Sequence, residues 1–342
     1  MAQQQQPVMN RPVTLLQAME DVEYQVANGD VARFQPLATG FHPLDDILNG
    51  GIRPGELLIV GGPYGVGKTI FGLQMARNVV RNNEKDWALY VCYEHDATHL
   101  LSRLLSLESA ERGFEQDALT LRRLGELSCN GSNGGGLIST LRRMPRYAAV
   151  LQTVESYADR LLLVRASGRY STPEQIREWV GEIDVSTNHR ILLVIDYLQK
   201  IPVRGDLLLS ESDATTYVTQ ALKELAVSSE IQVMAIAASD RAGLKSKRMR
   251  LVDLRGGSAL QYEADIGLIL NNKRDVVSRD HLVFNPIEAE EMRNWVVMSV
   301  EKNRAGRNAV DMEYLLDAAH FRFVPTGGFV RDRLVDEKVV LA

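Results

Sequence analysis

Apolar residues along this chain form short continuous runs that alternate with helical stripes. Runs of buried-strand length occur at Leu57–Gly61, Ala88–Tyr93, Leu161–Val164, Ile191–Ile195, Gln232–Ala237 and Ile266–Leu270. Such runs are typical of strands that are buried on both faces. Val296–Val300 and the stretch around Tyr314 and Phe321–Phe323 are expected to extend the same sheet. The alternation predicts an α/β fold, in which a mostly parallel, twisted sheet carries helices on both faces.

The N-terminal segment has a different pattern. Residues 1–12 contain a glutamine tract and two prolines, which predicts a disordered tail. One apolar helical stripe then runs over Val13–Ala27, and Asn28-Gly29-Asp30 ends it. We interpret residues 13–36 as a linker helix and its connection. The stripe must be buried somewhere, either on the chain's own core or on a neighbouring subunit.

Residues 37–330 are expected to form one α/β domain, followed by a C-terminal tail over 331–342. Within the domain, residues 121–160 have a weaker pattern and are interpreted as an insertion with a flexible loop at Gly131–Gly136. Its arginines are expected to form a solvated helical face: Arg122, Arg123, Arg142, Arg143 and Arg146. A helix start is predicted at Thr172, because Pro173 follows and Gln175 completes a capping box.

Composition narrows the class of protein. The 342 residues are 45% hydrophobic and 24% charged, which is ordinary for a globular protein. A membrane span is not expected, since no apolar run reaches about 18 residues. The N-terminus lacks the pattern of a secretory signal, and the two cysteines, Cys92 and Cys129, make a poor disulfide pair, so we expect a cytoplasmic protein. Because the net charge is −5, contact with nucleic acid would need a local basic patch.

The clearest chemical signal is Gly62-Pro63-Tyr64-Gly65-Val66-Gly67-Lys68-Thr69, which fits the P-loop pattern. It lies between a predicted strand and a predicted helix, as the motif requires. Its glycines let successive backbone N–H groups point at phosphate oxygens, and the helix N-terminus favours an anion. Lys68 can reach the β- and γ-phosphates, and the Thr69 hydroxyl can hold Mg²⁺. The predicted nucleotide-binding set is Gly62, Pro63, Tyr64, Gly65, Val66, Gly67, Lys68, Thr69 and Ile70, with ATP and Mg²⁺ as cofactors.

Two carboxylates follow predicted strands and complete the candidate catalytic set. Asp196 ends the apolar run Ile191–Ile195, at the edge where a parallel sheet presents ligand-binding groups. It is expected to support the metal together with Thr69, as a Walker-B aspartate does. Glu94 ends another predicted strand and is the candidate base that activates water. His95 and Asp96 are expected to stand behind it rather than in the site.

These motifs, taken in order, resemble the RecA-like motor domain of DnaB-type hexameric replicative helicases. The resemblance runs from about Thr39 to Phe323. Its most specific pieces are Asp196-Tyr197-Leu198-Gln199, the block from Asp253 to Asp265, and the run Glu301 to Gly306. The opening half, Thr39–Gly67, is also similar to KaiC-like and RadA-like ATPases. The resemblance implies that residues 37–330 form a RecA-like P-loop ATPase domain.

The resemblance also implies a homo-oligomer, as a hexameric ring, in which each ATP lies between subunits. Lys302 and Arg304 would then act in trans on the neighbour's γ-phosphate. Single-stranded DNA and a loader or collar protein are the other partners expected. A basic stretch supplies candidate DNA contacts, to which Arg204 adds a second loop. The predicted DNA-binding set is Arg204, Arg241, Lys245, Lys247, Arg248, Arg250, Arg255, Gly256 and Ser258.

One position departs from the family pattern. The family usually carries glutamine near the end of the strand after Walker B, where it senses the γ-phosphate, and this chain has Ala238. Ser239 follows, but the two-residue period of a strand predicts that it points elsewhere. The leading interpretation is a DNA-stimulated ATPase that translocates on single-stranded DNA. The alternatives are a KaiC-like or RadA-like regulatory or recombination ATPase, and a nucleotide-gated DNA-binding scaffold without unwinding activity.

Overall fold

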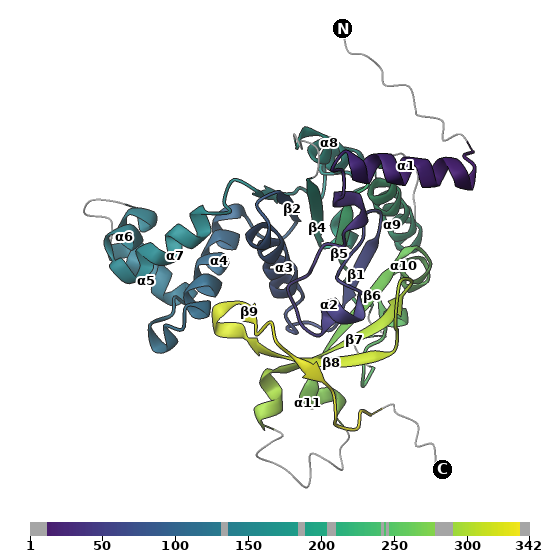
Figure 1. The fold of residues 1–342 in the computed structure, drawn as a ribbon. Coiled ribbons are helices and arrows are strands. Elements are labelled where there is room, and N and C mark those ends of the chain that lie inside the picture. The colour runs from purple at the N-terminus through teal and green to yellow at the C-terminus, as the bar shows by residue number, and fades with distance from the viewer. Residues whose placement is uncertain are drawn as a thin grey trace.

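The computed structural model describes residues 12–130, 136–183, 189–203, 210–240, 243, 246–277 and 290–335. Strands of this described part form one ten-stranded sheet in the order β10-β8-β7-β6-β1-β5-β4-β2-β3, with β9 paired to β8 (Figure 1). The strands are β1 Leu57–Gly61, β2 Asp86–Cys92, β3 Leu161–Arg165, β4 Arg190–Asp196, β5 Gln232–Ile236, β6 Ile266–Asn272, β7 Trp295–Asn303, β8 Val310–Asp317, β9 Arg322–Phe323 and β10 Gly328–Phe329.

The strands predicted from apolar runs are all present in the sheet. Those from β6 to β3 in the sheet order are parallel, whereas β7, β8, β9 and β10 are antiparallel. Central strand β1 is buried along its whole length, as its continuous apolar pattern predicts. Parallel strands direct their carboxyl ends to one edge, so the ends of β1, β2, β4 and β5 meet there.

Helices cover both faces of the sheet, and the strand period of two divides β1 between them. Leu58 and Val60 belong to the core on one face, together with Phe71 of the helix after the P-loop. Leu57 and Ile59 belong to the core on the other face. The helices are α1 Leu15–Ala27, α2 Leu44–Ile47, α3 Lys68–Asn82, α4 Ala97–Glu111, α5 Leu121–Asn130, α6 Leu137–Arg143, α7 Pro145–Glu155, α8 Pro173–Glu182, α9 Glu211–Ser228, α10 Gly257–Glu263 and α11 Lys273–Val276.

Two helix starts test the capping argument. Thr172 caps α8 as predicted, since its hydroxyl accepts a hydrogen bond from the Gln175 N–H at 3.5 Å. The reciprocal half of that capping box is not formed, because the Thr172 N–H donates to the Tyr170 carbonyl oxygen at 3.0 Å instead. A complete capping box begins α1, between Thr14 and Gln17. No helix in the described ranges is long and apolar enough to cross a bilayer.

The stretch interpreted as an insertion is a helical layer rather than an irregular excursion. Helices α5, α6 and α7 pack beside α4 at one end of the sheet (Figure 1). Leu124, Leu141 and Tyr147 bury their side chains in the same core as α3. Its arginines are solvated as expected, with Arg122 90% exposed and paired to Glu126. Most of the predicted loop at 131–136 lies outside the described residues.

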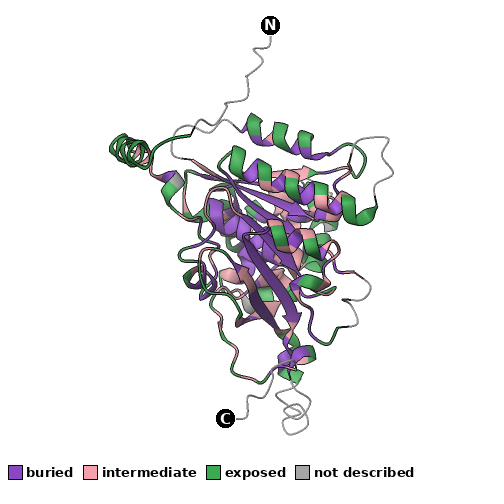
Figure 2. Cartoon of the chain, turned by 90° about the vertical axis from the view of Figure 1, so that its right-hand side faces the viewer, coloured by how far each residue is buried: buried purple, intermediate pink, exposed green. Residues whose placement is uncertain are grey.

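Helix α1 lies apart from the core (Figures 1 and 2). None of its residues is buried, and Leu15 and Leu16 are 79% and 64% exposed. Docking of its apolar stripe on the chain's own core, one of the two options predicted from the sequence, is therefore not observed. Docking on a neighbouring subunit stays a prediction.

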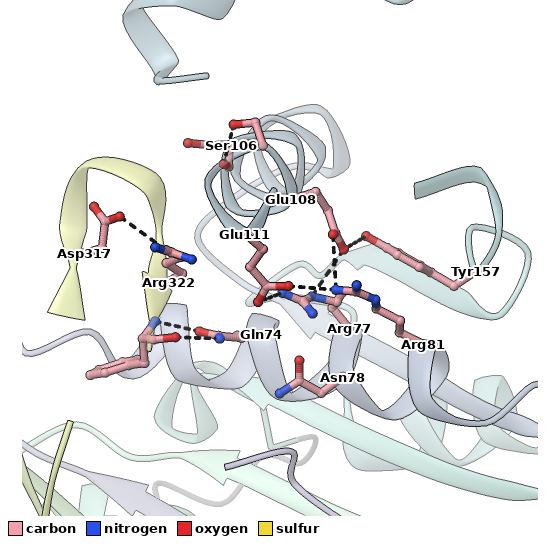
Figure 3. Close-up of polar contacts among 12 residues, drawn as sticks. Gln74, Arg77, Asn78, Arg81, Ser106, Glu108, Glu111, Tyr157, Asp317 and Arg322 are labelled. Carbon is pink, nitrogen blue, oxygen red and sulfur yellow. Dashed lines mark hydrogen bonds and ion pairs between the residues drawn. The ribbon is translucent and has the colours of Figure 1, made fainter. Parts of the chain in front are cut away.

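A buried ion-pair network joins α3 to α4 (Figure 3). Glu108 of α4 is 1% exposed and lies 3.4 Å from both Arg77 Nε and Arg81 Nη1 of α3. The Tyr157 hydroxyl, beyond α7, donates to the same carboxylate at 2.9 Å. Glu111 supplies a second carboxylate to both arginines. Because α3 begins at the P-loop, this network fixes the P-loop helix against the helical layer.

We expect Glu108→Gln to destabilise the protein by about 3 kcal/mol, since removing one charge leaves buried arginine charge short of a partner. The measurement is the urea unfolding midpoint. Glu126→Gln is the matched control, because Glu126 also pairs with two arginines but at the surface. That control should leave the midpoint nearly unchanged. Equal midpoints for the two variants would contradict the role given to the buried network.

Candidate functional site

The P-loop joins β1 to α3 through a backbone path that side chains would obstruct. Gly62 has φ of 149°, and a Cβ there would lie 2.3 Å from the Leu270 carbonyl oxygen of β6. Gly67 has φ of 90° and leaves no room for a Cβ beside the Phe323 ring. The first turn of α3 begins directly at Lys68. The loop therefore presents a helix N-terminus to the carboxyl edge of the sheet, as the motif predicts.

Lys68 is held within this loop. Its ammonium donates to the carbonyl oxygens of Gly62 at 2.8 Å and Pro63 at 2.6 Å. Burial lowers the pKa of Lys68 to about 8, against the opposing effect of Asp196 and Glu94. Among the residues that the structure describes, the cation forms no ion pair, and a phosphate would compensate the cost of its burial.

Asp196, at the end of β4, is 2% exposed. Its Oδ2 accepts a hydrogen bond from the Tyr90 hydroxyl of β2 at 2.9 Å, and the Thr69 hydroxyl also donates to it. Burial raises the pKa of this carboxyl group, and these hydrogen bonds oppose the rise. One hydroxyl and one carboxylate, both oxygen donors, suit Mg²⁺, which commonly takes its remaining ligands from water and phosphate. Within the described ranges, no cluster of three or more His, Cys, Asp or Glu could hold a metal alone.

Glu94 follows β2, whose last residue Cys92 is paired with Asp196 in register. The glutamate is exposed on the wall of the same cavity as Lys68 and Asp196. As expected, its two successors stand behind it. Asp96 caps α4 by accepting from the His99 N–H at 2.8 Å, and the His95 ring contacts Arg103.

These groups line one cavity of about 350 Å³ at the carboxyl edge of the sheet. Of the predicted residues, the lining contains Tyr64, Gly65, Gly67, Lys68, Thr69, Ile70, Glu94 and Asp196. Gly62 and Pro63 contribute through the carbonyls that bind Lys68, and Val66 is buried beneath the loop. The structure thus brings the predicted nucleotide and catalytic residues together, apart from Lys302 and Arg304.

The lining also contains residues that sequence reasoning did not assign to the site, among them Arg103, Tyr197, Phe321 and Ser239. Ser239 is a correction, because it was expected to point elsewhere. Strand β5 ends at Ile236, so the two-residue period no longer applies three positions later. Arg103 follows His99 by one helical turn. Its short distance from Glu94 in the sequence was the only, weak indication that it could belong to the site. Phe321 has φ of 52°, and no sequence pattern identified it.

The position of Ala238 is tied to its neighbours by main-chain bonds. The Arg255 N–H donates to the Ala238 carbonyl at 3.0 Å. The Gln199 side chain spans the same two residues: its oxygen accepts from the Ala238 N–H at 2.9 Å, and its nitrogen donates to the Arg255 carbonyl at 3.1 Å. Walker B, the end of β5 and the segment before α10 are thereby joined at the cavity wall. We call this arrangement the Gln199 bridge.

Lys302 and Arg304 lie together near the end of β7, outside the lining of this cavity. Arg304 is 51% exposed and pairs with Asp265 at 3.1 Å, while it donates to the Tyr262 carbonyl at 2.7 Å. The Lys302 ammonium donates to the carbonyls of Gln261 and Tyr262. Burial and the nearby Arg304 lower the pKa of Lys302. Neither cation therefore serves the cavity of its own chain.

Of the predicted DNA-binding residues, those that the structure describes do not all face solvent together. Arg204, Arg241 and Lys245 lie outside the described residues, and Lys247 and Ser258 are exposed. The remaining members contact acidic groups or pack closely. Arg248 is 6% exposed and forms hydrogen bonds with Asp311 and Ser299. Arg250 pairs with Glu301, and Arg255, which lines the cavity, pairs with Glu211. Gly256 packs against Thr215. This corrects the expectation that Arg248 faces a ligand, because its guanidinium is buried and pairs with Asp311.

A family model described as the DnaB-like helicase C terminal domain matches residues 36–323 of this chain. The chain belongs to this DnaB-like family. The replicative DNA helicase DnaB of Mycoplasma pneumoniae is 28% identical over 294 residues, which cover 84% of this chain and 56% of that protein. The corresponding protein of Geobacillus stearothermophilus is 25% identical, over 85% of this chain and 57% of its own length. The chain thus spans about half the length of the curated relatives that it matches.

Solved structures share the fold of this DnaB-like domain. The ATPase domain of G40P has a TM-score of 0.70 at 18% identity and covers 92% of this chain and 99% of that chain. A DnaB-like replicative helicase, described with its interactions with primase, has a TM-score of 0.64 at 18% identity over 92% of this chain and 67% of its own. The RecA-like α/β fold predicted from the sequence is confirmed.

We expect nucleotide binding by this DnaB-like chain to weaken as pH rises through about 8, the pKa of Lys68 in this structure. A bound phosphate favours the ammonium and raises its pKa, so binding takes up a proton above that pH, and affinity falls up to about tenfold per pH unit. Below that pH, Lys68 is already protonated in both states and contributes no pH dependence.

Calorimetric titration in two buffers of different ionisation enthalpy, one unit below and one unit above that pKa, measures the proton uptake. Phosphate groups lose their last proton near about pH 6 and should not contribute. Lys68→Met is the control, since it removes the titrating group. Uptake that persists in Lys68→Met, or none in the natural protein at the higher pH, would contradict the assignment.

Proposed function

We propose that this chain is the motor domain of a DnaB-type helicase, which hydrolyses ATP and uses the cycle to move on single-stranded DNA. The observation that carries the proposal is the convergence of Lys68, Asp196 and Glu94 on one cavity beside the P-loop. Membership of the DnaB-like family supports it. The natural working state in this proposal is a homo-oligomeric, hexameric ring in the cytoplasm.

In the proposed reaction, the P-loop amides and Lys68 bind the β- and γ-phosphates of ATP. Thr69 would ligate Mg²⁺ directly and Asp196 would do so through water; the ion, when bound, supplies neutralisation of the charge on the phosphate oxygens. Glu94 accepts a proton from the attacking water. Tyr90 keeps the Asp196 carboxylate oriented through its hydrogen bond.

In the proposed ring, each pocket receives additional positive charge from the adjacent subunit. Lys302 and Arg304 lie outside the lining of their own cavity, where Arg304 is 51% exposed and Lys302 is partly exposed. In the proposed ring they reach the γ-phosphate bound by the adjacent subunit. The exposed stripe of α1 packs on a neighbour in the same assembly, which would bury Leu15 and Leu16. A loader or collar protein would act on this ring.

DNA contact is proposed for the basic segment between β5 and α10. Lys247 is exposed and Arg250 is 38% exposed, so both can reach a phosphate backbone. Arg204, Arg241 and Lys245 stay proposed contacts from loops outside the described residues, while Arg255, Gly256 and Ser258 form the adjoining border. Contact with the backbone rather than with bases fits the basic character of these residues.

A second candidate function rests on Ala238, which lines the cavity but has no side-chain donor for a phosphate. Without that contact, the nucleotide cycle would gate DNA binding or assembly instead of driving movement. This is the KaiC-like or RadA-like regulatory ATPase, or a nucleotide-gated DNA-binding scaffold. A strand-displacement assay beside the ATPase assay separates the two functions, because DNA-stimulated hydrolysis without displacement selects the second.

Mixing Arg304→Ala subunits with Glu94→Gln subunits should restore part of the ATPase activity that each variant lacks alone. Mixed rings contain interfaces where an intact Glu94 faces an intact Arg304 of the next subunit, and a trans-acting arginine is worth roughly 10³ to 10⁵ in rate. The measurement is ATPase rate against mixing ratio. No recovery at any ratio would count against action in trans.

Affinity for single-stranded DNA should fall steeply with salt, and Lys247→Ala should reduce the slope of log affinity against log salt by about 1. The matched control is Arg122→Ala, which removes another exposed cation, one that belongs to the helical layer. Fluorescence anisotropy with a labelled oligonucleotide at several salt concentrations measures both slopes. Binding that is absent or insensitive to salt would remove DNA from the proposal.

A further inference from the structure

Arg103 is a cation in the nucleotide cavity that the proposed reaction does not yet use. It comes from the second turn of α4 and lines the same cavity as Lys68, Glu94 and Asp196. It forms no ion pair with any carboxylate of the described residues. Its Nε is buried and has no hydrogen-bond partner within that part of the chain. An arginine has five N–H donors, so most of its hydrogen-bonding capacity is unused here.

The surroundings hold the guanidinium in place without neutralising it. Its carbon lies 5.1 Å from the centroid of the Phe321 ring, a stacking partner that suits a planar cation. Its Nη2 lies 3.0 Å from His95 Nε2. Burial lowers the pKa of Arg103, because its charge is partly desolvated. Asp196 and Glu94 oppose that shift from a distance, so a nearby anion would stabilise the charge further.

The contact with His95 connects Arg103 to the turn that carries Glu94. Arginine can only donate, so His95 Nε2 must accept and its ring must be neutral. Burial and the Arg103 charge both lower the pKa of His95, which favours that neutral form. The His95 N–H donates to the Cys92 sulfur at 3.3 Å. The turn from Cys92 to Asp96 is therefore fixed at His95, the residue next to Glu94.

We infer that Arg103 is a second phosphate-binding cation supplied in cis, which contacts the terminal phosphate across the cavity from Lys68 and positions Glu94 through His95. The inference rests on the proposed function, since it concerns the same pocket. Arg103 would supply a hydrogen-bond donor that contacts the γ-phosphate, which the Ala238 side chain cannot supply. It also differs from the proposal for Lys302 and Arg304, which serve the pocket of another subunit.

A residue that only packs against Phe321 would affect all nucleotides alike, so the test compares ATP with ADP. A non-hydrolysable ATP analogue and ADP are titrated into the natural protein, Arg103→Ala and Arg103→Lys. We expect Arg103→Ala to weaken binding of the analogue about 10- to 100-fold more than binding of ADP, as for the loss of a charge-assisted hydrogen bond. Arg103→Lys should recover part of this difference. Lys68→Ala should weaken the binding of both nucleotides.

Two controls address folding. Arg112→Ala removes another arginine from the end of α4, where it donates to Thr153 outside the cavity, and should leave both affinities unchanged. Phe321→Leu removes the stacked ring but keeps the charge, and should change the ratio of the two affinities less than Arg103→Ala does. Equal losses of both nucleotides in Arg103→Ala, or none, would overturn the inference while leaving the proposed function intact. A natural protein that binds no triphosphate would instead remove the proposed function itself.

The mixing experiment distinguishes cis from trans. In rings of Arg103→Ala and Glu94→Gln subunits, every pocket lacks one of the two residues, whichever subunit is its neighbour. We therefore expect no recovery of ATPase activity, in contrast to mixtures of Arg304→Ala with Glu94→Gln. Recovery with Arg103→Ala would place the arginine in the neighbour's pocket and overturn the assignment in cis.

Discussion

The fixed position of the Lys68 ammonium is the interaction on which the site depends. Two main-chain carbonyls of the P-loop hold it, and those carbonyls are in place only because glycine allows the chain to turn against β6. The parallel sheet then brings Asp196 and Glu94 to the same edge from neighbouring strands. The part-buried Lys68 cation forms no ion pair within the described part of the chain, which is costly, and a triphosphate relieves that cost. Binding and fold are therefore linked through one side chain.

Helix α3 carries this constraint away from the pocket. It begins at Lys68, and its middle exchanges hydrogen bonds between the Gln74 amide and the main chain of Phe323 at 2.7 and 2.8 Å (Figure 3). Its later turns enter the ion-pair network with α4, the helix that also carries Arg103. The P-loop, the cavity wall and the helical layer are thus parts of one rigid arrangement. Precise placement of charge around a phosphate requires such support.

Local patterns determined what the sequence could predict. Continuous apolar runs identified the strands, and spacing within the P-loop identified Lys68 and Thr69, because both signals lie within a few residues. Asp196 and Glu94 followed from their positions at strand ends. The Gln199 bridge, the stack of Phe321 on Arg103 and the burial of Arg248 against Asp311 could not be predicted in this way. Each depends on partners far apart in the chain, and a basic residue reads the same in sequence whether it faces solvent or a buried carboxylate.

The Gln199 bridge has a consequence for how the pocket tolerates variation. Its bonds to residue 238 use only the main-chain N–H, and the Arg255 N–H uses only the main-chain carbonyl of the same residue. The side chain at position 238 therefore takes no part in these hydrogen bonds. A substitution at position 238 can therefore change the contacts that the pocket makes with its ligand while the hydrogen bonds of the Gln199 bridge are kept. Ligand recognition and the structure of the cavity wall can vary independently at this position.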